Sequence, residues 1–153
     1  MTSTRRHVLI SAGRFFAGLC AATVLQPLTA FAARNAAAFR APSPDEALAA
    51  LGATGAQPSE LIDLQTPEIA ENGAVVPVVV ESRLPNTRAI AIMVEKNPSV
   101  LSARFEIPEG TDPQVATRVK VAETSAIIAL VQTDEGSYLA RKTVKVTLGG
   151  CGG

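Results

Sequence analysis

Side chains that usually perform acid–base, metal and redox chemistry are scarce in this chain. Among its 153 residues are one histidine, His7, two cysteines, Cys20 and Cys151, and no tryptophan. If residues 1–32 are removed as argued below, no histidine remains to activate a nucleophile, and one cysteine cannot build a zinc site. We therefore expect no metal and no cofactor, and the sequence predicts a protein that is not itself an enzyme.

Aromatic side chains and excess positive charge are also lacking. The chain has one Tyr and five Phe, and its 14 Lys and Arg residues equal its 14 Asp and Glu residues. Removal of residues 1–32 takes away Arg5, Arg6 and Arg14 but no acidic residue, which leaves a net charge of −3. Nucleic-acid-binding proteins normally present a basic patch with aromatic side chains for stacking. We therefore expect no nucleic-acid partner.

Residues 1–32 have the features of an export signal. The segment TRRHVL, which contains Arg5 and Arg6, resembles the twin-arginine consensus. An apolar stretch follows over about residues 15–28, and Ala30-Phe31-Ala32 is an A-x-A cleavage site. The stretch is too short for a transmembrane helix and contains a proline. We expect residues 1–32 to be removed, with no membrane anchor, and the protein to be exported folded into the periplasm.

The segment 33–148 is long enough for one domain. It begins with the alanine-rich residues 33–41, which we expect to be loose. A short helix is predicted from Pro44 to about Leu51, because Ser43 is a good N-cap, proline suits the first helical position, two acidic residues complement the helix dipole, and Gly52 suits the end.

After residue 60 the sequence is typical of β-structure. Asn72-Gly73 and Asp134-Glu135-Gly136 are hairpin-type turns, and Pro77 predicts an edge position or a bulge. Short apolar or alternating runs predict about seven strands: Leu61–Gln65, Ala74–Glu81, Arg88–Glu95, Ala103–Ile107, Thr117–Ala122, Ala126–Gln132 and Leu139–Leu148. With no long helix between them, these strands predict an all-β, immunoglobulin-like antiparallel β-sandwich with an aliphatic core.

The most informative residues are the last five: Gly149, Gly150, Cys151, Gly152 and Gly153. Glycine has no Cβ to restrict its backbone, so we expect residues 149–153 to form a flexible arm that carries the thiol. Extended, five residues span at most about 16 to 18 Å, enough to cross an enzyme's vestibule. An exposed thiol near its usual pKa of about 8.5 is chemically usable. We therefore predict that Cys151 is the functional residue.

Several stretches of the chain resemble the SoxY family, the carrier subunits of sulfur oxidation. The most specific is VKVTL at 144–148 followed by the glycines and Cys151, and the supporting stretches are PEIAENGAVVPVVV at 67–80, Asn97-Pro98, and TRVKVAETS at 117–125. The chain departs from the family pattern at Val100, where a second proline is expected. The resemblance covers nearly the whole chain.

The resemblance implies that Cys151 is the covalent attachment point for sulfur intermediates. It also implies an immunoglobulin-like fold and a heterodimer with a SoxZ-like subunit in periplasmic thiosulfate oxidation. The implied enzyme partners are a haem protein that loads the thiol, a manganese hydrolase that releases sulfate, and a sulfur dehydrogenase.

Three other interpretations remain open. Cys151 is, in the simplest case, a tail thiol that merely oxidises or pairs between chains. A ubiquitin-like sulfur carrier also ends in paired glycines, but its terminal carboxylate, here that of Gly153, is activated with ATP. A non-catalytic adhesion or assembly sandwich would make no use of the arm. Blocking the thiol distinguishes these possibilities from a carrier that depends on Cys151.

Overall fold

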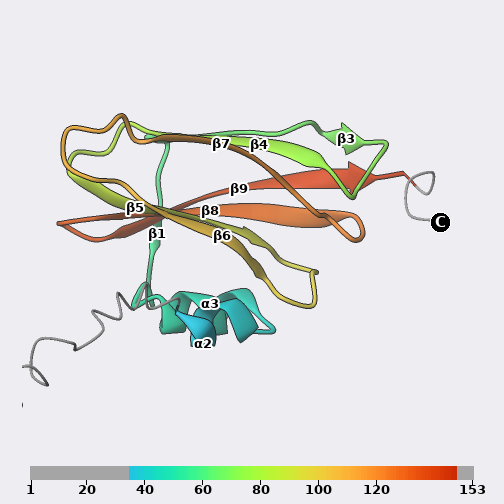
Figure 1. The fold of residues 1–153 in the computed structure, drawn as a ribbon, viewed down its shortest axis with the longest axis horizontal. Coiled ribbons are helices and arrows are strands. Elements are labelled where there is room, and N and C mark those ends of the chain that lie inside the picture. Colours follow the sequence, from blue (N-terminus) through green and yellow to red (C-terminus); the bar gives the residue numbers. More distant parts are fainter. Residues whose placement is uncertain (1–34, 148–153) are drawn as a thin grey trace, which may run out of the picture. The chain divides into compact units, whose positions relative to one another are not determined.

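The computed structural model describes residues 35–147, which are mostly β-structure (Figure 1). Two short helices precede nine strands. Their bounds are α2 Ala36–Arg40, α3 Pro44–Ala50, β1 Gln57–Pro58, β2 Ile62–Gln65, β3 Ile69–Ala70, β4 Val76–Ser82, β5 Thr87–Val94, β6 Leu101–Glu106, β7 Gln114–Val119, β8 Ser125–Thr133 and β9 Ser137–Val146. Within this part of the chain, no helix is long and apolar enough to cross a membrane.

The strands form two sheets. The larger, six-stranded sheet has the order β1-β9-β8-β5-β6, and β3 also pairs with β9. The smaller sheet has the order β2-β4-β7. The long strands pair in antiparallel fashion, whereas the two-residue strands β1 and β3 run parallel to β9. This arrangement confirms the predicted all-β sandwich with a short N-terminal helix, while its immunoglobulin-like kinship stays a prediction.

The larger sheet is covered on both faces. Alternate residues of β5 belong to two apolar clusters: Ile90 and Ile92 pack between the sheets, and Ala91 and Met93 pack toward the helices. Figure 1 shows the helices on the face opposite the smaller sheet. Because β5 and β8 are buried on both faces, their sequences read as continuous apolar runs. Each fully buried Ile contributes about 1.5 to 3 kcal/mol through removal from water.

The predicted helix at residue 44 is confirmed, with its caps. The Ser43 hydroxyl accepts a hydrogen bond from the Glu46 N–H (3.3 Å) and donates one to the Glu46 carboxylate (3.1 Å), which is the reciprocal pattern of a capping box. Pro44 occupies the first turn, and Gly52 has a φ of 68° just past the helix. Local chemistry therefore determines where α3 begins and ends.

The expectation that residues 33–41 are loose is wrong for the residues that the structure describes. Ala36–Arg40 is helical, and the Asn35 side chain accepts from the Ala38 N–H (3.1 Å) and donates to the Ala50 carbonyl (2.7 Å). Alanine is the best helix former, and Ala38 is fully buried because its small side chain allows close packing.

Val100, where the family pattern has a proline, contributes to the same packing. Its N–H donates to the Ala41 carbonyl (3.4 Å), and its side chain is fully buried. A proline at this position has no N–H to donate. The departure therefore adds a backbone contact between the end of α2 and the segment before β6.

The seven predicted strands are confirmed, with ends shifted by a few residues. Asp134-Glu135-Gly136 joins β8 to β9 as a hairpin, as expected. Asn72-Gly73 is a turn but not a hairpin, because it connects β3 in one sheet to β4 in the other. Pro77 lies in β4 beyond the end of β2, which pairs only from Val79 onward, so that side of β4 is an open edge at the proline.

Candidate functional site

The residues predicted to carry the chemistry lie outside the described range. These are Cys151 with Gly149, Gly150, Gly152 and Gly153, and the signal residues Arg5 and Arg6. The predicted boundaries at residues 32 and 148 also lie outside it and stay predictions. The structure does describe β9 and Thr147, four residues before Cys151. The site can therefore be built from its root.

The end of β9 is hydrogen-bonded on both sides. On one side, the Lys145 N–H donates to the Glu68 carbonyl (2.8 Å), and the Thr147 N–H donates to the Ala70 carbonyl (3.1 Å). On the other side, the Val146 N–H donates to the Thr124 hydroxyl (3.1 Å). Strand ends commonly fray, but here successive amides alternate between two neighbours up to the last described residue. The root of the arm is therefore fixed.

Gly73 brings a second segment against this root. A Cβ on Gly73 would lie 2.4 Å from the Val121 carbonyl oxygen and 2.9 Å from Val146 Cγ1. The Val121 N–H donates to the Gly73 carbonyl (2.7 Å), which fixes this close approach. Only glycine fits between two backbones at such a distance. The turn before β4, the end of β7 and the end of β9 are thus packed together at one point.

Apolar burial supports the same end of the strand. Val144 is fully buried and Ala70 is 6% exposed, and both belong to the cluster between the sheets, against which Val146 packs. Asn97 stabilises the loops nearby, since its amide donates to the Lys120 carbonyl (2.7 Å) and accepts from the Ala122 N–H (3.1 Å). The fixed geometry at the root thus continues into the core.

Exposed side chains surround the root. Ile69 of β3 is 58% exposed and Val75 of the turn before β4 is 50% exposed. Lys145 and Thr147 are exposed as well. Among the residues that the structure describes, no cluster of three or more His, Cys, Asp or Glu side chains is placed to hold a metal ion. The described part of the site can present a side chain but has no chemical group that acts on sulfur.

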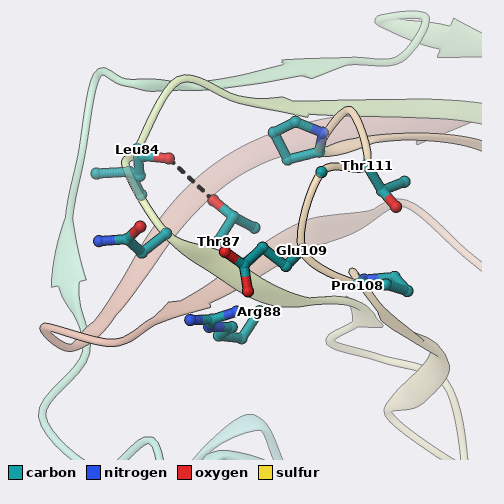
Figure 2. Close-up of a pocket in the computed structure, with 9 residues that line it drawn as sticks. Leu84, Thr87, Arg88, Pro108, Glu109 and Thr111 are labelled. Atoms are coloured by element: carbon teal, nitrogen blue, oxygen red, sulfur yellow. Dashed lines mark hydrogen bonds between the residues drawn. The ribbon is translucent and has the colours of Figure 1, made fainter.

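A concave surface lies at the other end of the sandwich (Figure 2). It has a volume of about 300 Å³ and is lined by the β4–β5 turn and the β6–β7 loop. The Thr87 hydroxyl donates to the Leu84 carbonyl (3.1 Å) inside it. Arg88, the one cation among its lining residues, is bound by Asp134 through two hydrogen bonds of 2.8 and 2.7 Å.

This ion pair changes how both groups titrate. Hydrogen bonding to Arg88 lowers the pKa of Asp134, and hydrogen bonding to Asp134 raises the pKa of Arg88. Both side chains are about half exposed, so water screens the interaction. Because the guanidinium is already paired, the cavity holds no free charge for an anionic substrate, and we assign it no chemistry.

Sequence reasoning missed the residues that fix the root. Glu68 and Ala70 act through their carbonyl groups, which no residue type reveals. Thr124 and Gly73 were quoted only as parts of longer stretches. The glycine after Asn72 was the one available signal, because a glycine in a turn can also permit close approach of two backbones.

The fold and the root define a class of protein: a small two-sheet β-protein whose last long strand leads into a glycine-flanked cysteine. A family model described as "Sulfur oxidation protein SoxY" matches residues 47–151, a range that includes Cys151. The chain belongs to the SoxY family. No curated protein sequence matched it.

Solved structures agree with this assignment. The sulfur carrier protein SoxY from Chlorobium limicola f thiosulfatophilum is 38% identical, with a TM-score of 0.64 over 71% of this chain and 96% of that one. Superoxide reductase (neelaredoxin) from Ignicoccus hospitalis is 21% identical, with a TM-score of 0.51 over 56% of this chain and 79% of that one. The second likeness concerns the fold alone.

Proposed function

We propose that this protein is a sulfur carrier that holds sulfur intermediates covalently on Cys151 and presents them in turn to separate enzymes. The observation that supports this most strongly is the SoxY family match, which extends through Cys151, together with 38% identity to a sulfur carrier protein. The fixed end of β9 adds a physical reason. A thiol on a glycine-rich segment reaches different enzymes best when the segment starts from a rigid point.

Loading forms a disulfide bond at the thiolate. Cys151–S⁻ and thiosulfate join to give Cys151–S–S–SO₃⁻, and the two electrons released pass to a haem protein as oxidant. Hydrolysis by water then cleaves the S–SO₃ bond and leaves sulfate, two protons and a persulfide on Cys151. Attachment keeps the intermediate at high effective concentration for each visiting enzyme.

The carrier relies on its partners for proton transfer. The only histidine of the chain, His7, lies in the predicted signal segment, so the usual general base is not available to the exported protein. The manganese hydrolase supplies the activated water for sulfate release, and the sulfur dehydrogenase oxidises the remaining sulfur. This division of labour matches a chain with a thiol but no catalytic cluster near the described root.

The proposed setting is the periplasm. Arg5 and Arg6 direct folded export, and a SoxZ-like subunit pairs with this chain before export and leaves with it. Changing both arginines to lysine should hold both subunits in the cytoplasm, as measured by immunoblot of cell fractions. Normal periplasmic amounts of both subunits in the variant would contradict this step.

The two rival functions receive less support. A ubiquitin-like carrier needs a helix packed across one sheet and an ATP-dependent activation, whereas the described residues form two sheets and the family match is to SoxY. An adhesion module would not need a fixed root beside the glycine-flanked cysteine.

Turnover with Cys151 and glycine variants tests the proposal. Cys151→Ser should abolish thiosulfate-dependent sulfate production without changing the unfolding curve or the pairing with the SoxZ-like subunit. Gly150→Pro should keep the thiol titratable but slow loading and hydrolysis, because proline fixes φ near −65°. Full activity of Cys151→Ser would refute the carrier function.

A further inference from the structure

Large apolar side chains that remain strongly exposed are few in the described part of the chain. They are Leu61 at 46%, Ile69 at 58% and Val75 at 50%. Single exposed apolar residues are normal on protein surfaces and need no explanation. The positions of two of these residues, however, are related to the site, whereas the position of the third is not.

Ile69 and Val75 bracket the end of β9. Ile69 pairs with Lys145 in the parallel β3–β9 ladder, one residue before the carbonyl that binds Thr147. Val75 lies two residues after Gly73, whose Cα is packed against the Val146 side chain. We call Ile69 and Val75 the collar. Figure 1 shows β3 and the β3–β4 turn at the tip of the β9 arrow.

Leu61 lies elsewhere. It precedes β2, and its carbonyl accepts from the Arg83 N–H (2.8 Å), just past the end of β4. Val75 directly precedes the start of β4 at Val76. Leu61 and Val75 are thus separated by the whole length of that strand, which makes Leu61 a control of nearly equal exposure.

The length of chain beyond Thr147 limits where an enzyme can dock. Cys151 is four residues beyond Thr147, so the two Cα atoms lie at most about 13 to 14 Å apart. An enzyme that takes the sulfur of Cys151 into an enclosed site must therefore bring its entrance within about that distance of Thr147. Exposed side chains around the root then become part of the contact surface.

We infer that the collar is the docking surface for the apolar rim of the enzyme entrances that receive Cys151. This inference rests on the proposed carrier function and adds to it a surface on the folded domain. Glu68, Glu71 and Lys145 are exposed around the collar, which gives the apolar centre and polar surroundings typical of protein interfaces. Burial of both collar side chains stabilises the encounter with each enzyme, while the arm carries the substrate.

The test uses the full chain paired with its SoxZ-like subunit and loaded chemically. Tetrathionate reacts with the Cys151 thiolate to give Cys151–S–S–SO₃⁻ and releases thiosulfate, so loading needs no enzyme. The variants are Ile69→Ser with Val75→Ser, and Leu61→Ser as the matched control. Sulfate release by the manganese hydrolase gives kcat/KM, and 5,5′-dithiobis(2-nitrobenzoate) measures access to the unloaded thiol.

The collar variant should lower kcat/KM by about tenfold, mainly through a higher KM, because two partly buried contacts are lost. Its thiol should react with the reagent at the wild-type rate, and Leu61→Ser should stay within about twofold of wild type in every assay. If the double variant folds poorly, Ile69→Thr and Val75→Thr singly should each lower kcat/KM by about threefold.

Two results would overturn the collar as an enzyme-docking surface. One is an unchanged kcat/KM in all collar variants, with the loaded wild-type protein still releasing sulfate. The other is loss of the SoxZ-like subunit or of self-association on size-exclusion chromatography, which would assign the surface to another chain. If the wild-type protein neither loads nor releases sulfate, the carrier function itself fails, which is a distinguishable outcome.

Discussion

The two ends of β9 are held in different ways. At its end, successive backbone amides of Lys145, Val146 and Thr147 are bound on alternate sides, and Gly73 permits two backbones to approach closely. At its start, the hairpin is tied by side chains that are exposed to water, chiefly the Arg88–Asp134 pair.

This difference shows where the molecule needs a fixed position. Exposed ion pairs contribute little and are screened by salt, whereas buried backbone contacts determine geometry directly. The Asn86 amide also donates to Glu135 at the start of the strand (3.1 Å), again between exposed groups. The end that leads to Cys151 has the rigid construction, and the opposite end, with its cavity, has the adaptable one.

The largest effect should come from Gly73→Ala. Its Cβ would lie 2.4 Å from a backbone oxygen, so the turn or the end of β7 must move, at a cost of about 1 to 3 kcal/mol in the free energy of unfolding. Gly136→Ala at the opposite end is the control, since its nearest neighbour is Tyr138 at an ordinary 3.8 Å. Urea unfolding measures both. Equal losses would remove the proposed difference between the two ends.

A smaller effect is expected for Thr124→Val. The variant keeps the shape of the side chain but removes the acceptor for the Val146 N–H, which costs about 1 kcal/mol. Amide exchange at Val146 should accelerate by about fivefold if the root loosens by that amount. Thr133→Val is the matched control, because its hydroxyl accepts from the Glu135 and Gly136 N–H groups in the hairpin. Faster exchange at Val146 in the control would contradict a locally fixed root.

The smallest effect should follow loss of the Arg88–Asp134 pair. The pKa of Asp134 is lowered in the folded protein, so the pair stabilises the fold above the ordinary Asp pKa of 3.8 and loses this contribution as the pH falls through the folded value. Asp134→Asn should therefore lower the urea midpoint slightly at pH 7 and not at all at strongly acidic pH. A difference that persists after Asp134 is protonated would show that the charge is not the cause.

Much of the fold could be predicted from local sequence signals. Ser43, Pro44 and Gly52 act within a few residues, and so determined the helix bounds. The strands were visible because their apolar patterns are long enough to be distinctive. The chemistry of Cys151 was also inferred from composition, because a thiol among four glycines has few structural explanations.

Long-range contacts could not be predicted in the same way. The two-residue strands β1 and β3 exist only because β9 offers a partner, and their own sequences carry no strand pattern. The helix at Ala36 was missed because an alanine run is compatible with both disorder and close packing. Its burial depends on neighbours such as Val100 and on the sheet beneath it.

The stretches that resemble the SoxY family meet at the root. Gly73 belongs to 67–80, Asn97 begins the Asn97-Pro98 pair, and Thr124 belongs to 117–125, and each contacts the end of β9 or an adjoining loop. In the sequence these segments are separated by tens of residues. Their common role is therefore apparent only in three dimensions: they position the strand that leads to Cys151.

Intact-mass analysis of the full chain after incubation with thiosulfate and the haem loading enzyme tests the carrier function most directly. The account predicts a mass increase that corresponds to one S–SO₃⁻ group, located on the peptide that contains Cys151 and removed by a disulfide reductant. Cys151→Ser should show no increase under the same conditions. An unmodified wild-type chain, or an adduct that forms equally on Cys151→Ser, would contradict the central claim.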